Sequence, residues 1–477
     1  MSRRLSISVA WLKRWRKDRK TGQPVPLSLP PEIWLRIISF LPPPEEWPKL
    51  KLYRVNRTFL DHYIRRTYRE LVLFNPVPYL DGFAKTQYPD EYRTRRNLSV
   101  LRDPIRSEVV RTLKIRLKVQ YYDYHREAAD PENLEMALRS HLELLREGQE
   151  IARRPSLSEA PHIHLPRLNK LSLDLSKALG FRADPPRLLE KSLREHTYPF
   201  LATHAHLITT FSFSTPLDDP KIGDACFKNL PTFPALESLS IQVSSDRTST
   251  WDGASRFLQQ HSPKLKQLKI IISPRVVLSE RRSRESIASS ISSHNWTQPF
   301  FWAIPMPSLT EFQLFTDMIP AEGGPSLASQ LPKSLNQLER LILSKPMSMP
   351  GDIGKLINHL ETDGDIHQLK ELFMTKAEVD HLGLRALARG FPQLRRLSIH
   401  SLDLKIDGLD ASKLDEAIVR VARATSEWAL EQFDFRHFPS PEGDAAKYRH
   451  AIAAALPGVH LFQGTDRFFW VEDIEII

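Results

Sequence analysis

The sequence predicts an α/β protein in which a short helical module is followed by an irregular solenoid of parallel strands and helices. Two observations lead to this fold class. An apolar segment bounded by prolines lies near the N-terminus, and a leucine pattern recurs through the rest of the chain at intervals that include 28 and 29 residues. With 41% hydrophobic and 26% charged residues among 477, the chain has the composition of an ordinary globular protein with room for several domains.

Residues 1–26 are expected to form a basic flexible tail. Residues 1–20 hold eight Lys or Arg against Asp18, a net charge of +7 out of the chain's +10. Such a tail is a solvated extension, a nuclear import signal, a nucleic-acid-binding arm or a mitochondrial presequence. Because all other residues together carry only +3, nucleic acid is not the expected partner of the folded body.

Cysteine content and hydropathy indicate the type of cellular compartment in which the chain is expected to work. Cys226 is the single cysteine, so the chain has neither a disulfide framework nor a zinc site built from thiolates. No stretch of the sequence approaches the roughly 18 apolar residues that a membrane span needs, and no membrane partner is expected. These features favour a reducing compartment, which is the cytoplasm, the nucleus or both.

Residues 27–71 are expected to form the helical module. Ser28 or the tandem prolines Pro30 and Pro31 start a helix with Glu32 in its first turn, and the proline cluster that begins at Pro42 stops it. Two or three short helices bury too little surface to cover such a helix, so a second surface has to complete its burial. The apolar positions surround the helix axis rather than form one stripe, and they are residues 33, 34, 35, 37, 38, 40 and 41.

The same segment carries a recognisable pattern, which is Leu29-Pro30-x-Glu32-Ile33, Ile37, Leu41, Val55-Asn56-Arg57-Thr58-Phe59 and Leu71. With these residues the segment resembles an F-box. The resemblance implies that the helices dock on a Skp-type adaptor, which joins such proteins to a cullin-based ubiquitin ligase core. It also implies adaptor-binding residues, which either face the adaptor or define the module: Leu29, Pro30, Ile33, Ile37, Leu41, Val55 and Phe59.

A repeated strand signature organises residues 72–477. The pattern Pro-x-Leu-x-x-(Leu/Phe)-x-(Leu/Ile) occurs five times, and further copies lack the proline. In Leu-x-Leu, alternate side chains point inward from a short strand, and x faces the concave side of the sheet. The middle position of the pattern falls at residues 113, 171, 211, 239, 268, 312, 341, 372, 397 and 433.

The pattern is similar to the strand signature of leucine-rich repeats. The resemblance implies a parallel sheet lining the concave side of a solenoid, with helices on the convex side. Helix-like segments at 254–260, 382–389 and 414–424 fit this alternation. Longer intervals predict insertions near 120–165, which includes a helix, and near 273–300, which reads as a loop rich in serine and arginine.

No motif for catalysis or cofactor binding is present. The sequence lacks Gly-x-Gly-x-x-Gly, a Walker lysine loop, His-Glu-x-x-His and Gly-x-Ser-x-Gly. The pairs His162/His164 and His204/His206 supply two ligands each, which is too few for a metal site. No catalytic residue, cofactor or metal is therefore predicted, and the chain is not expected to be an enzyme.

The predicted concave face offers a binding surface. Arginine and aromatic side chains dominate binding energy at protein interfaces, which favours the C-terminal half of this face. The alternative is a hydrated concave face, with the partner bound at an edge or an insertion loop. The predicted target-binding residues are Arg340, Phe373, Arg396, His400 and Arg436.

Together these features predict a substrate-recognition subunit of a Skp-cullin-F-box ubiquitin ligase. The helical module would dock on the adaptor, and the repeats would hold a target protein whose identity the sequence leaves open. The alternative is a leucine-rich-repeat scaffold that binds partners without a ligase role and uses the helical module as an N-terminal cap.

Overall fold

The chain divides into two units, Met1–Thr67 and Tyr68–Ile477. The division falls before residue 71, the expected end of the helical module, because residues 70–74 form a strand of the second unit. The computed structural model describes residues 30–41, 51, 56–74, 97, 100–101, 103–118, 165–177, 193–215, 220–245, 251–274, 304–316, 337–344, 356–357, 368–403, 428–437, 453, 456–462 and 465–466.

The first unit contains the helices α2 (Pro31–Ser39) and α4 (Arg57–Thr67). The carbonyl of Pro30 accepts the first hydrogen bonds of α2, as the tandem prolines predict. At the start of α4, the side-chain oxygen of Asn56 accepts a hydrogen bond from the backbone N–H of Phe59 at 3.0 Å. An asparagine in this position satisfies an N–H group that has no partner within the helix.

A small apolar core joins α2 to α4. Ile38 and Phe59 are buried, and the ring of Trp34 meets the ring of Phe59 edge to face at 5.6 Å. The partly buried residues around them are Trp34, Ile37, Leu41 and Tyr63. Trp34, Ile38 and Leu41 lie on one side of α2, so a single stripe of this helix faces α4.

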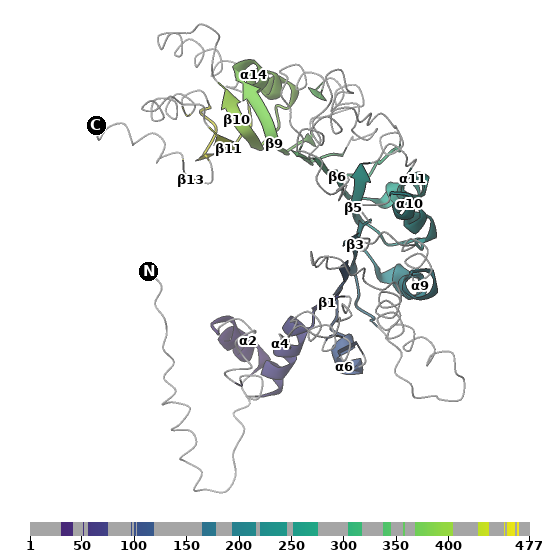
Figure 1. Cartoon of the computed structure of the whole chain (residues 1–477). Coiled ribbons are helices and arrows are strands. Elements are labelled where there is room, and N and C mark those ends of the chain that lie inside the picture. Colours follow the sequence, from purple (N-terminus) through teal and green to yellow (C-terminus); the bar gives the residue numbers. More distant parts are fainter. Residues whose placement is uncertain are drawn as a thin grey trace, which may run out of the picture. The chain divides into compact units, whose positions relative to one another are not determined.

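The second unit is built on one sheet whose strands follow one another in chain order (Figure 1). Strands β1 to β12 pair in parallel, and β13 is antiparallel to β12. The strands are β1 (Glu70–Phe74), β2 (Thr112–Lys118), β3 (Lys170–Lys177), β4 (Thr210–Ser214), β5 (Ser238–Ser245), β6 (Gln267–Pro274), β7 (Glu311–Thr316), β8 (Arg340–Ser344), β9 (Glu371–Asp380), β10 (Arg396–Asp403), β11 (Gln432–His437), β12 (Leu461–Phe462) and β13 (Thr465–Asp466).

The predicted parallel sheet is confirmed, because all ten middle positions of the repeated pattern lie in β2 to β11. Strands β1, β12 and β13 were not predicted. The helices of this unit are α6 (Pro104–Ser107), α9 (Tyr198–His204), α10 (Pro220–Asn229), α11 (Asp252–His261) and α14 (His381–Gly390), with short turns η3 (Leu193–Thr197), η4 (Ala205–Leu207) and η5 (Ser262–Lys264).

The helices expected at 254–260 and 382–389 are confirmed as α11 and α14. The helix expected at 414–424 lies outside the described residues, as do nearly all of the two predicted insertions. In the part of the chain that the structure describes, no helix is long and apolar enough to cross a membrane.

A repeated backbone hydrogen-bond pattern sets the register of the sheet. The carbonyl before each of β1 to β11 accepts two N–H groups from the start of the next strand. The Glu237 carbonyl, for example, accepts the N–H groups of Lys266 at 2.8 Å and Gln267 at 3.0 Å. Equivalent residues of neighbouring strands therefore lie side by side in rows across the sheet.

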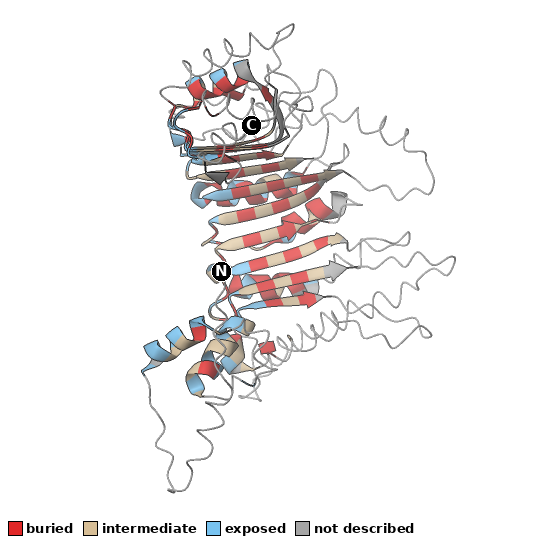
Figure 2. Ribbon diagram, turned by 90° about the vertical axis from the view of Figure 1, so that its left-hand side faces the viewer, coloured by how far each residue is buried: buried red, intermediate tan, exposed pale blue. Residues whose placement is uncertain are grey.

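Two of these rows form the core. Along each strand buried residues alternate with half-buried ones, which Figure 2 shows as bands of colour. The buried side faces the helices, since Phe213 packs edge to face on Phe227 of α10 at 4.8 Å and Phe211 lies 6.2 Å from Phe257 of α11. The first row runs from Leu71 of β1 through Leu113, Leu171, Phe211, Leu239, Leu268, Phe312, Leu341, Leu372 and Leu397 to Phe433.

A buried histidine completes the backbone hydrogen bonding behind the sheet. The backbone N–H of Phe233 donates to Nε2 of His261 at 2.9 Å, so Nδ1 carries the proton and donates to the Phe257 carbonyl at 2.7 Å. Burial lowers the pKa of His261 below its ordinary value of 6.5, and the bond to the Phe257 carbonyl opposes that shift. The neutral ring is therefore the one that fits the folded state.

Replacing His261 with glutamine should reduce the acid sensitivity of the fold. In the unfolded chain the histidine takes up a proton near pH 6.5, whereas the folded state resists it, so the stability contributed by the neutral ring is lost as pH falls below that value. The free energy of unfolding, measured by urea titration at pH 7.5 and 5.5, should fall less in His261→Gln than in the native chain.

His206→Gln, at an exposed position of η4, is the matched control and should leave the pH dependence unchanged. Identical pH dependence in all three proteins would contradict the role given to His261.

Candidate functional site

The open face of the sheet carries the side chains that alternate with the buried rows. It corresponds to the predicted concave face, and its side chains are half-buried or exposed along β2 to β11. In-register pairing places residues from different repeats next to one another, as with Glu311, Arg340 and Glu371 at the start of β7, β8 and β9. The neighbours of each charged side chain on this face therefore come mainly from the adjacent strands.

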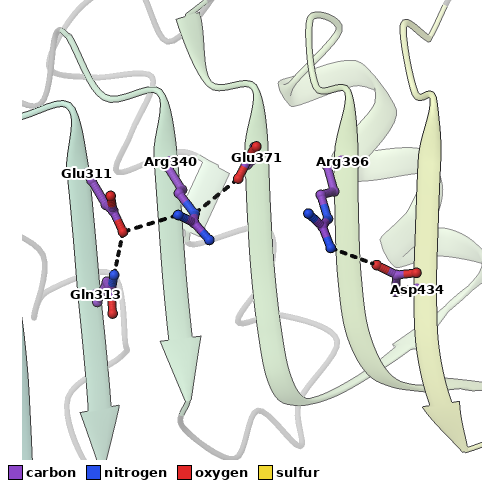
Figure 3. A network of polar contacts seen from close by, with 6 residues as sticks. All are labelled: Glu311, Gln313, Arg340, Glu371, Arg396 and Asp434. Atoms are coloured by element: carbon purple, nitrogen blue, oxygen red, sulfur yellow. Dashed lines mark hydrogen bonds and ion pairs between the residues drawn. The ribbon is translucent and has the colours of Figure 1, made fainter. Parts of the chain in front are cut away.

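Arg340 lies between two carboxylates (Figure 3). Its Nε is 3.0 Å from Glu371, and its Nη1 is 3.5 Å from Glu311. Glu311 also accepts a hydrogen bond from the side-chain amide of Gln313. The side chain of Glu311 is only 15% exposed, so this carboxylate depends on the partners that surround it.

Arg396 repeats the arrangement on β10 and β11. Its Nη2 is 3.5 Å from Asp434, which also accepts a hydrogen bond from the amide of Gln432 at 2.9 Å (Figure 3). Both arginines predicted to bind a target are therefore already paired with carboxylates from neighbouring strands, which reduces their attraction for an outside anion.

Phe373 lies between these two arginines. The guanidinium carbons of Arg340 and Arg396 are 5.2 Å and 5.0 Å from the centre of its ring. Both distances are within the range of a cation–π contact. Carboxylates and an aromatic ring together hold both guanidinium groups in place, so this surface is ordered before any partner binds.

The structure brings three of the five predicted target-binding residues together, and the other two lie on β10, which also carries Arg396, and on the neighbouring strand β11. His400 lies at the irregularity of β10 between Ile399 and Ser401. Arg436 lies in β11, but its side chain is outside those described. Glu311 was not among the predicted residues, although it contacts Arg340. The alternation along the strand that predicted the other positions also places Glu311 on the open face. The target-binding assignment stays a prediction.

The helical module has a different kind of surface. Ile33 is 44% exposed and Phe40 is 71% exposed, and both lie on the side of α2 that is turned away from its buried stripe. Leu35 and Leu60 are also exposed, at 49% and 39%. Large apolar side chains gathered on so short a segment are typical of a surface that another molecule covers.

Five of the seven predicted adaptor-binding residues are described, and they differ in exposure. Pro30 and Ile33 are exposed, and Ile37 and Leu41 are partly buried beside the small core. Phe59 is buried, which suits a residue that defines the module rather than one that touches a partner. Leu29 and Val55 lie outside the described residues.

Positive charge accompanies the apolar surface on α4. Arg65 and Arg66 lie in the last turn of this helix, where positive charge complements the helix dipole. Burial, followed by the charges of Arg66 and Arg65, lowers the pKa of His62 below 6.5. His62 is therefore a neutral side chain at pH 7.

Neither a metal site nor a reactive thiol emerges from the described residues. Within them, no group of three His, Cys, Asp or Glu side chains is arranged to hold a metal ion. Cys226 is buried in α10, and its carbonyl accepts a hydrogen bond from the Tyr198 hydroxyl at 3.2 Å. This cysteine lies within the packed core of the second unit.

Comparison with known proteins adds no assignment. No protein-family model matches the chain, and no curated protein is significantly similar to it. The two surfaces described above are therefore the features of the chain that indicate its function.

The ion pair between Arg340 and Glu371 should stabilise the fold measurably. A double-mutant cycle with Arg340→Met and Glu371→Gln is expected to give a coupling energy of about 0.5 to 1 kcal/mol in urea unfolding, since the two side chains are partly buried and their charged atoms are 3.0 Å apart. The pair Arg395 and Glu431 is the control, because its atoms are 3.7 Å apart and both side chains are more than half exposed. Its coupling should be near zero, and equal coupling in the two pairs would contradict the preorganised array around Phe373.

Proposed function

We propose that the chain is the substrate-recognition subunit of a Skp-cullin-F-box ubiquitin ligase. The helical module docks on a Skp-type adaptor, and the solenoid holds a target protein. The chain performs no chemistry. It raises the effective concentration of the target's lysines near ubiquitin that other subunits of the ligase deliver.

The observation that carries this proposal is the second apolar surface of α2. One stripe of the helix packs on α4, while Ile33 and Phe40 remain exposed on another side. The F-box resemblance at Leu29-Pro30-x-Glu32-Ile33 supplies an occupant for that surface, namely a helical adaptor with an apolar groove. Burying such side chains is worth roughly 1.5 to 3 kcal/mol each.

The proposal places the target on the open face near Phe373. Arg340, Phe373 and Arg396 combine the residue types that dominate interface energies, and they are held in place before binding. His400 lies on β10 with Arg396, and Arg436 lies on the next strand, β11. The proposed location is the cytoplasm, the nucleus or both.

A second function remains compatible with the fold. The chain would then be a repeat scaffold that binds partners without a ligase, and the helical module would be an N-terminal cap. The two functions differ in what covers Ile33 and Phe40, since only the first requires a Skp-type adaptor.

A pull-down of the full-length chain with a purified Skp-type adaptor tests the ligase function. The native chain is expected to bind, and Ile33→Asp should weaken binding by about tenfold or more, because a charge would enter an apolar interface. Ile33 is already exposed, so its substitution leaves the core of Ile38 and Phe59 intact, which circular dichroism can verify.

Ile105→Asp is the matched control, because Ile105 is an exposed isoleucine of α6 in the second unit and is 71% exposed. It should bind the adaptor as the native chain does. Absence of binding by the native full-length chain would reject the ligase function and leave the scaffold as the better account. Equal loss in both variants would show that the exposed face of α2 is not the docking surface.

A further inference from the structure

The open face is electrically asymmetric. The described open-face side chains of β2 to β6 carry an excess of positive charge. Those of β7 to β11 include slightly more carboxylates than cations. The first group consists of Lys114, Arg116, Lys170 and Lys269 against Asp174, and the second of Arg340 and Arg396 against Glu311, Glu371 and Asp434.

Two lysines of the positive half have no carboxylate partner among the described residues. Lys170 is exposed at the start of β3, and Lys269 lies on β6 with its Nζ 4.7 Å from the centre of the Phe315 ring. Lys114, in contrast, is paired with Glu70 at 2.6 Å. Lys170 and Lys269 are therefore the cations on this half that can accept an outside anion without losing an ion pair.

The strands between these lysines present hydroxyl groups. Ser172, Ser212 and Ser240 form one row that ends at Lys269, and Thr210 and Ser238 continue the row that begins at Lys170. These side chains are half-buried, and their hydroxyls have no hydrogen-bond partner among the described residues. Each hydroxyl can donate to a peptide carbonyl and accept from a peptide N–H.

We infer that the open face of β3 to β6 binds an acidic segment of a partner protein, laid in extended form across the strands. Carboxylates of the segment pair with Lys170 and Lys269, and its backbone bonds to the hydroxyls between them. The inference rests on the proposed function only in requiring a protein partner for the solenoid. It is independent of adaptor binding and assigns a surface separate from that around Phe373.

The spacing of the two lysines defines the segment. Three strand separations and a step of two residues along the strands put their Cα atoms about 16 Å apart. An extended peptide advances about 3.3 Å per residue, so acidic residues four positions apart span about 13 Å, and the lysine stems bridge the difference. Residues at that separation also point to the same side of an extended chain, because its side chains alternate.

A protein segment suits this surface better than a nucleic acid. Single-stranded nucleic acids bind on aromatic rings that stack with the bases. The described open-face side chains of β2 to β6 include no aromatic ring, since they are lysine, arginine, aspartate, serine, threonine, glutamine and isoleucine. Hydroxyl groups bond well to the regularly spaced amides of an extended peptide.

Fluorescence anisotropy on the full-length chain tests this inference. The probes are fluorescein-labelled twelve-residue peptides of glycine, serine and alanine that carry two glutamates separated by one to seven positions. Affinity should be highest at a separation of four and should fall when NaCl is raised from 50 to 200 mM. Lys170→Glu/Lys269→Glu should weaken binding by about tenfold or more, because two attractive pairs become repulsive.

The control makes the same change of charge on the helices. Arg256 of α11 and Arg385 of α14 are exposed and have no partner among the described residues, so Arg256→Glu/Arg385→Glu should bind the peptides as the native chain does. Equal weakening in both double variants, or affinity independent of glutamate spacing, would overturn the inference. Tighter binding of a single-stranded oligonucleotide than of any peptide would also overturn it.

Failure of this inference can be told apart from failure of the ligase function. Ile33→Asp should leave peptide affinity unchanged, and Lys170→Glu/Lys269→Glu should leave adaptor binding unchanged. Loss of peptide binding in Ile33→Asp would count against the inference, because it would mean that the peptides bind the helical module.

Discussion

In-register pairing of parallel strands is the constraint on which the solenoid depends. Each carbonyl that precedes a strand accepts two N–H groups from the next strand, so every repeat enters the sheet at the same point. A slip of one residue would move the leucines and phenylalanines of both buried rows to the open face. The hydrophobic pattern of the sequence and the backbone hydrogen bonds thus favour the same register. Such agreement between local and global structure is expected of a stable fold.

The same register determines the electrostatics of the open face. Glu311 and Arg340 are 29 residues apart in sequence, yet they occupy equivalent positions of adjacent strands. A charge at the first position of a strand therefore meets whatever the neighbouring repeat carries at that position. Glutamate and arginine alternate from β7 to β10, and the result is a row of paired charges. Threonine and serine occupy those positions in β4 and β5, and Lys170 beside Thr210 has no carboxylate partner within the described part of the chain.

The fold was largely predictable from sequence because its signal repeats. Ten copies of one pattern predicted ten strands in the right order, and in five of the copies a proline precedes the strand. Strand β1 was missed because Leu71 and Leu73 stand next to α4 and lack the preceding Leu-x-x spacing. Strands β12 and β13, of two residues each, are too short to show any periodicity.

The candidate site was harder to predict, for a physical reason. The alternation of side chains along a strand assigns each residue to one face of the sheet. The partner of a charged side chain, however, depends on the register between neighbouring repeats. That register is hard to read from the sequence because the repeats are separated by unequal numbers of residues. Arg340 and Arg396 therefore looked like available cations, although Glu311, Glu371 and Asp434 lie beside them. The apolar residues around α2 were predicted to need a second surface to bury them. Which of them pack in the core and which stay exposed depends on the position of α4, which the sequence alone does not give.

The two units thus present surfaces governed by different forces. The helical module exposes Ile33 and Phe40 beside a core of two fully buried side chains, so any partner there gains chiefly from removing apolar area from water. The second unit has its own buried core, and the described side chains of its open face are mostly charged or carry hydroxyl and amide groups, so a partner there gains chiefly from charge and hydrogen bonds. Salt screens the second kind of interaction and leaves the first nearly unchanged. A chain built this way can remain attached to one partner through its apolar surface while it exchanges another through its polar one.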